Sequence, residues 1–127
     1  MAMTTTDGGD SATDENSHLD AAACLFHGFS DPSRIAILRH LALGEHRVVD
    51  LTHHLGLAQS TVSKHLACLR DCGLVSARAQ GRATVYSLNH ADALMDVWNA
   101  AERLLDLTGE AVALCPTYGT AAASGHR

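Results

Sequence analysis

The sequence feature that most constrains the fold is a pair of short amphipathic segments separated by a glycine turn. Residues 48–55 (VVDLTHHL) form the first segment, and Gly56-Leu57 interrupts its pattern. A second helical segment runs from about residue 59 to about residue 72, and its predicted buried side consists of Val62, Leu66 and Leu69. Two short helices joined by a tight turn that contains glycine form the helix-turn-helix pattern.

A basic β-hairpin is predicted directly after these two helices. Gly73 ends the second helix, and two alternating segments, VSARA and ATVYSL, then flank Gln80-Gly81-Arg82. Alternation around a turn that contains glycine is typical of a two-stranded hairpin. Arg78 and Arg82 lie at or near its tip. A basic hairpin that follows a helix-turn-helix is a wing.

Three further helices are predicted around this unit. The first runs from about residue 18 to Gly28, and the second is capped by Ser30 or Asp31, with Pro32 in its first turn. The last extends from about residue 91 to 108. The fold class is therefore mainly α with a small β-hairpin (α+β), a winged helix-turn-helix. We expect the first and last helices to form a homodimer, whose two-fold symmetry suits a palindromic operator.

The two ends of the chain are predicted to lie outside the folded domain. Residues 1–17 are rich in Thr, Ser, Gly and Asp and are expected to form a disordered tail. The domain spans residues 18–108, and residues 109–127 form a C-terminal tail. Neither a signal peptide nor an apolar run of about 18 residues is present, so we expect a cytoplasmic protein without a membrane partner.

The charge distribution favours a nucleic-acid partner although the formal net charge is −5. Acidic residues gather near the N-terminus, whereas cations outnumber acids between residues 30 and 88. Local sign, not the sum, steers a protein toward phosphates. A recognition helix also needs short polar side chains for bases. The predicted DNA-binding residues are Gln59, Ser60, Thr61, Ser63, Lys64, His65, Arg78 and Arg82.

Several motifs resemble the ArsR/SmtB family of bacterial metal-responsive repressors. They are the SDPSRIAILRHL entry to the second helix, the QSTVSKHL recognition helix and the CGLV-to-GR wing. The resemblance covers about residues 19–108. It implies a homodimeric repressor, not an enzyme, that binds double-stranded operator DNA when metal-free and is released by a metal ion.

Two cysteines on the recognition helix are candidates for metal ligands. Cys68 and Cys72 are four residues apart, which places both side chains on one helix face with Cβ atoms about 5–6 Å apart. Thiolates select soft or borderline metals. Cys115 is the candidate third ligand, because it follows the last helix on a segment that is free to move. In a dimer it can reach the partner's recognition helix.

The cysteine pattern resembles the CmtR subgroup of cadmium and lead sensors, through the sequence HLACLRDC. This resemblance implies Cd2+ or Pb2+ as effector, bound by Cys68, Cys72 and Cys115. Zinc and trivalent arsenic are alternatives. Two other metal sites of the family lack key ligands here. Arg47 and Val49 stand where a Cys-x-Cys pair is expected, and the last-helix positions are Asn89, Ala91, Glu102 and Leu105.

Other interpretations of the thiols remain open. Cys24 is predicted to be buried in the dimer interface, while His18, His90 and His126 are possible auxiliary ligands. A thiol redox repressor that uses Cys68 and Cys72 is one alternative. Another is a repressor of the same fold that answers to a protein partner. A thiol reductase is disfavoured, because there is no Cys-x-x-Cys motif near a βαβ unit.

Overall fold

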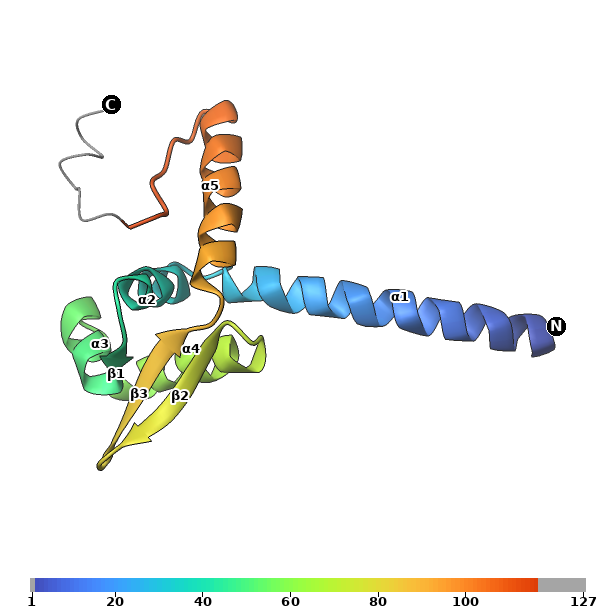
Figure 1. The fold of residues 1–127 in the computed structure, drawn as a ribbon. Coiled ribbons are helices and arrows are strands. Elements are labelled where there is room, and N and C mark those ends of the chain that lie inside the picture. The colour runs from blue at the N-terminus through green and yellow to red at the C-terminus, as the bar shows by residue number, and fades with distance from the viewer. Residues whose placement is uncertain (1, 117–127) are drawn as a thin grey trace.

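The computed structural model describes the backbone of residues 2–116 and the side chains of residues 15–116 (Figure 1). The predictions for residues 117–127, including the auxiliary ligand His126, concern residues outside this range. Within it, helices and strands follow in the order α1 (Ala2–Gly28), α2 (Pro32–Ala42), β1 (His46–Arg47), α3 (Val48–Leu55), α4 (Gln59–Asp71), β2 (Val75–Gln80), β3 (Ala83–Leu88) and α5 (Ala91–Leu107). The fold is a winged helix-turn-helix, as the sequence predicts.

The turn between α3 and α4 depends on Gly56. This residue ends α3 with φ 67°, a left-handed conformation that glycine adopts without steric cost. Its N–H donates to the carbonyl of Thr52 at 2.8 Å. The two helices then pack through Leu51 of α3 and the predicted seam of α4, and all of these side chains are fully buried: Leu51, Val62, Leu66 and Leu69.

The wing belongs to a sheet of three strands in the order β1-β3-β2. β2 and β3 form the predicted antiparallel hairpin, from Val75 opposite Leu88 to Gln80 opposite Ala83. β1 pairs with β3 on the other side, with His46 opposite Tyr86. The sequence analysis does not predict β1, because two residues are too short to show alternation. In Figure 1 the hairpin extends away from the helices.

A core of aliphatic side chains and one tryptophan joins the helices to the sheet. Trp98 and Leu94 anchor α5, and Val75 contributes from β2. Helix α2 contributes Ile37, Leu38 and Leu41. Phe29, in the loop after α1, meets Trp98 edge-to-face with ring centroids 6.2 Å apart. The core therefore fixes α4 and the wing relative to α2 and α5.

Helix α1 projects from the rest of the molecule, and only its C-terminal part reaches the other elements (Figure 1). Its last residue, Gly28, is buried against α4, and a Cβ there would lie 3.0 Å from Leu74 and 3.4 Å from Leu69. This close approach favours glycine, because a Cβ would push the ends of the two leucine side chains aside by a few tenths of an ångström. The helix also includes residues 2–17, for which the composition predicts a disordered tail. No helix in the described part of the chain is long and apolar enough to cross a membrane.

Candidate functional site

Helix α4 presents its polar side chains to solvent at its N-terminal end. Its apolar seam faces the core, so the opposite side is free to approach a partner. Residue Ala58 precedes the helix, and no side chain caps the first N–H groups. Such groups are suited to a phosphate. The predicted DNA-binding residues of this end are exposed except for the half-buried Thr61: Gln59, Ser60, Thr61, Ser63 and Lys64.

The tip of the wing carries the two predicted arginines. Gly81, with φ 64°, forms the turn, and exposed Arg82 follows it. Arg78 lies on β2, where its Nη2 donates to Oε1 of Glu45 at 2.6 Å. Both partners of this ion pair are about half exposed, so solvent screens it. Gln59 and Arg82 line one cavity of about 260 Å³, so the wing lies beside the start of α4.

The end of α1 is tied to the recognition helix by one buried arginine. Arg34 Nη2 donates to the carbonyl of His27 at 2.8 Å and to Oγ of Ser30 at 3.0 Å, and Nε donates to the carbonyl of Gly28. Nη1 lies 3.3 Å from Nδ1 of His65 on α4. The sequence patterns above do not predict this role. The sequence pattern that could have predicted it is an arginine three residues after the Asp that caps α2, close behind the end of α1.

Asp31 begins helix α2 and completes this network. Its Oδ1 accepts from the N–H groups of Ser33 at 2.7 Å and Arg34 at 3.3 Å, so Asp31 and not Ser30 is the cap. Burial raises the pKa of Asp31, but these two hydrogen bonds and the charges of His65 and Arg34 outweigh it. The net pKa lies below the ordinary value of 3.8. His65 is therefore held toward the protein, half-buried between Asp31 and Arg34.

The thiols of the recognition helix are arranged differently from what their spacing predicts. A disulfide joins Cys72, at the C-terminal end of α4, to Cys24 of α1, with Cα atoms 5.7 Å apart. Cys68 is free and half-buried. Cys24 therefore contacts the recognition helix of its own chain. The two residues are 48 positions apart. Spacing along one helix cannot reveal a contact that arises where another helix crosses its end.

Cys115 lies on a segment whose backbone is hydrogen-bonded to α5 and α2, whereas the sequence predicts a segment that is free to move. Glu102 of α5 accepts from the backbone N–H groups of Leu114 and Cys115, the latter at 2.7 Å. Arg39 of α2 donates to the carbonyl of Leu114 at 3.0 Å. The thiol itself lies 3.1 Å from Oδ1 of Asn99. Burial, followed by the charge and hydrogen bonding of Glu102, raises the pKa of Cys115, and Arg39 only partly opposes this.

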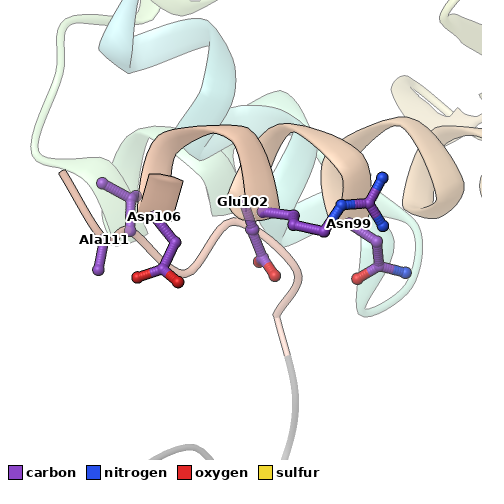
Figure 2. A pocket seen from close by; sticks show the side chains of 6 residues that line it. Asn99, Glu102, Asp106 and Ala111 are labelled. Carbon is purple, nitrogen blue, oxygen red and sulfur yellow. The ribbon is translucent and has the colours of Figure 1, made fainter. Parts of the chain in front are cut away.

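The segment after α5 and one side of that helix line an open polar pocket of about 350 Å³. Figure 2 shows Asn99, Glu102 and Asp106 along one side of α5, with their polar groups directed toward this segment. Ala111 lies on the segment itself. Glu102 thus serves both the cavity and the hydrogen bonds that fix Cys115. The sequence does not predict this role of Glu102. It shows only that Glu102 lies at a last-helix position where the related family has a metal site.

The three predicted thiol ligands do not meet within one chain. Among the side chains that the structure describes, no three His, Cys, Asp or Glu residues are already arranged to hold a metal ion. Cys68 and Cys72 lie on α4, whereas Cys115 packs on α5. The auxiliary candidates His18 and His90 are exposed, on α1 and at the start of α5. A complete thiolate site therefore needs a second chain or a rearrangement.

Comparison with known proteins identifies relatives among bacterial regulators. Residues 31–77 match the family model "Bacterial regulatory protein, arsR family". The chain is 41% identical over 71 residues to the probable mercury resistance operon repressor of Streptomyces lividans, covering 56% of this chain and 57% of that protein. It is 47% identical over 68 residues to the transcriptional regulator CmtR of Mycobacterium tuberculosis, covering 54% and 58%. The matches thus span less than two thirds of either relative.

A solved structure extends the likeness over most of the fold. The homodimeric winged helix-turn-helix DNA-binding domain of a possible ArsR-family transcriptional regulator from Mycobacterium bovis matches with a TM-score of 0.62. It is 31% identical, and the match covers 72% of this chain and 89% of that one. That protein is itself described as a winged helix-turn-helix domain, which is the fold found here.

Proposed function

Because the chain belongs to the arsR family of bacterial regulatory proteins, we propose that it is a transcriptional repressor that binds operator DNA as a metal-free homodimer. The family consists of DNA-binding regulators and not of enzymes. The observation that carries the proposal is the exposed polar end of α4, uncapped and beside the basic tip of the wing.

In the proposed interface, some side chains contact bases and others contact phosphates. Gln59 is able to make a paired contact to adenine, and the hydroxyl groups of Ser60, Thr61 and Ser63 suit either bases or phosphates. Lys64 and the uncapped N–H groups of α4 suit the backbone. Arg78 and Arg82 reach the backbone or the minor groove from the wing. His65 acts through its contact with Arg34, which sets the position of the helix.

The proposed dimer forms through α1 and α5. Four large apolar side chains on these helices are 58–76% exposed in the single chain: Leu19, Phe26, Leu104 and Leu107. Exposed apolar surface favours association, because burial removes it from water. A two-fold dimer places its two α4 helices in successive major grooves, about 34–36 Å apart.

The proposed effector is Cd2+ or Pb2+, bound by Cys68 and Cys72 of one chain and by Cys115 of the partner subunit. Zinc and trivalent arsenic are the alternative ions. Supporting facts are the soft thiolate donors and the likeness to CmtR and to a mercury resistance repressor. Cys72 becomes a ligand only when its disulfide to Cys24 is reduced. Metal binding must favour the DNA-free dimer, and DNA must weaken metal binding to the same degree.

The test is an operator-binding titration under a thiol-free reductant. The protein is bound to labelled DNA from upstream of its own gene, and cadmium, lead, zinc and arsenite are added in turn. We expect cadmium or lead to release the DNA. Cys68→Ser, Cys72→Ser and Cys115→Ser should bind DNA but resist release. Cys24→Ser is the matched control and should respond normally. Release of any of the first three variants at wild-type metal concentrations would remove that residue from the site.

A mixed dimer tests whether Cys115 acts across the subunits. One chain carries Cys115→Ser and the other carries Cys68→Ser with Cys72→Ser, so neither chain alone has three thiol ligands. If ligation crosses the dimer, the mixed dimer regains one complete site and binds one cadmium ion per two chains. If ligation stays within one chain, neither homodimer nor mixture binds cadmium tightly.

If no metal releases the DNA in the operator titration, a protein effector becomes the better explanation.

The disulfide favours a second candidate function, in which thiol oxidation releases the operator. Hydrogen peroxide accepts two electrons from the thiols of Cys24 and Cys72, which form the S–S bond while two water molecules leave. The pair differs from the Cys68–Cys72 pair suggested by spacing. Peroxide should then release DNA from metal-free wild-type protein but not from Cys24→Ser. Equal release from both proteins would exclude this pair as the sensor.

A further inference from the structure

Three histidines from three different elements meet on the side of the domain formed by α2, β1 and α3. They are His40 of α2, His46 of β1 and His54 of α3. Their ring centroids are 5.0 Å apart for His40 and His54, 5.6 Å for His46 and His54, and 6.0 Å for His40 and His46. The three elements are neighbours in Figure 1. These three residues belong neither to the proposed thiol site nor to the proposed DNA-binding residues.

The spacing of the rings suits a metal ion at their centre. A Zn–N bond of about 2.0–2.1 Å in tetrahedral geometry places the centroids of three imidazole rings about 5 Å from one another. As they stand, the rings of His40 and His54 are stacked, only 10° from parallel, so their nitrogens do not converge. Rotation about the terminal torsion of histidine has a broad, shallow profile. The nitrogens can therefore turn inward without moving the backbone.

One ring nitrogen of His46 is already hydrogen-bonded to the backbone. Its Nδ1 lies 2.8 Å from the carbonyl oxygen of Gly44. A carbonyl only accepts, so Nδ1 donates its proton and Nε2 is the nitrogen left for a metal ion. Metal-bound histidines usually donate their second ring N–H in this way, which fixes the tautomer and strengthens the ligand. This contact is independent of the ring distances.

The environment of His40 favours its neutral form, and His54 is accessible to solvent. Burial lowers the pKa of His40, and the charges of His54, His46 and Arg39 add to the effect, so this ring is neutral at neutral pH. Only neutral imidazole binds a metal. His54 is exposed, which leaves room for a water ligand. A cavity of about 140 Å³ opens beside His40, between α2 and Pro116.

We propose that His40, His46 and His54 bind a divalent first-row transition metal, typified by Zn2+, with water as the fourth ligand. Imidazole nitrogen suits these borderline ions, whereas the thiol site suits softer ones. The bound ion joins α2 and β1 to α3, the first helix of the helix-turn-helix. It therefore holds that helix in place independently of the thiol site.

The test measures zinc binding by an untagged full-length chain in which all four cysteines are serine. Competition with a chromophoric chelator should give one Zn2+ per chain. His54→Gln and His46→Gln should each weaken binding at least about tenfold. His53→Gln is the matched control, because His53 is the exposed neighbour of His54 in the same helix, and it should leave the affinity unchanged.

A second measurement keeps the proposal testable if the serine variant does not fold. Zinc is added to the reduced wild-type chain whose thiols are occupied by cadmium, and the imidazole resonances are followed by NMR. Selective shifts of His40, His46 and His54 support the site. Absence of zinc binding, or binding that His54→Gln does not weaken, overturns it. Neither result bears on release by cadmium, so the thiol proposal is judged separately.

Discussion

Nη1 of Arg34 lies 3.3 Å from Nδ1 of His65, which links the end of α1 to the middle of the recognition helix. The same guanidinium donates to the carbonyl groups of His27 and Gly28 at the C-terminal end of α1, where His27 also accepts from the N–H and Oγ of Ser30. The position of the DNA-binding helix therefore depends on a residue that is buried and cannot itself reach DNA.

Replacing Arg34 with methionine should destabilise the fold and weaken DNA binding. The substitution leaves the carbonyl of Gly28 without its donor and removes one of the three donors to His27, which we expect to cost about 1–3 kcal/mol of unfolding free energy. Urea denaturation measures the loss. His65→Gln keeps an acceptor for Arg34 and should cost less than about 1 kcal/mol. Equal losses in the two variants would contradict the assignment of the helix-end carbonyls to Arg34.

Acid should weaken the start of α2 through Asp31. The folded-state pKa of this carboxyl lies below its unfolded value near 3.8. Its contribution to stability is therefore present above about pH 3.8 and is lost as the pH falls through the folded pKa. Asp31→Asn caps a helix without titrating. The denaturation midpoint should drop less between neutral pH and a pH below 3.8 in Asp31→Asn than in wild type. An equal drop in the two proteins would refute the prediction.

Removing the Glu102 carboxylate should release Cys115. Glu102→Ala takes away the acceptor for two backbone N–H groups and a cause of the raised thiol pKa. We expect faster amide exchange at Leu114 and Cys115, and faster alkylation of Cys115 near neutral pH. Asp106→Ala is the control, since Asp106 lines the same cavity. The prediction fails if alkylation rates are unchanged in Glu102→Ala or rise equally in both.

A charge on α5 should weaken the proposed dimer. Leu104 is 63% exposed in the single chain. Leu104→Asp should raise the dimer dissociation constant at least about tenfold, or about 1.4 kcal/mol. Sedimentation equilibrium gives the constant. Leu43→Asp changes an exposed leucine at the end of α2 and should have no effect, whereas equal weakening would point to another interface.

The first sixteen residues of α1 should contribute little to stability. Residues 2–17 are polar and project from the domain, and a helix without packing is marginal in water. We expect rapid amide exchange there, in agreement with the predicted tail. Deleting residues 2–17 should change the unfolding free energy by less than about 0.5 kcal/mol. Strong protection of these amides would show that the helix has a partner.

The sequence predicts most of the helices and strands, because each depends on a pattern of residues that are close together in the chain. Val62, Leu66 and Leu69 repeat at helical spacing and are all fully buried, and the predicted hairpin turns at Gly81. Contacts between distant segments left no such pattern. Three features arise where separate elements cross. They are the Cys24–Cys72 disulfide, the hydrogen bonds between Glu102 and the backbone at Cys115, and the histidine cluster. The ligand roles of Cys68, Cys72 and Cys115 stay predictions.

The disulfide between Cys24 and Cys72 has a practical consequence for handling the protein. A preparation exposed to air should titrate with two reactive thiols per chain, whereas a freshly reduced one should titrate with four. Cadmium stoichiometry would then vary with storage, since an oxidised chain has lost one of its proposed thiolates. Thiol counting before each metal titration separates a protein that does not sense metal from one that was purified without reductant.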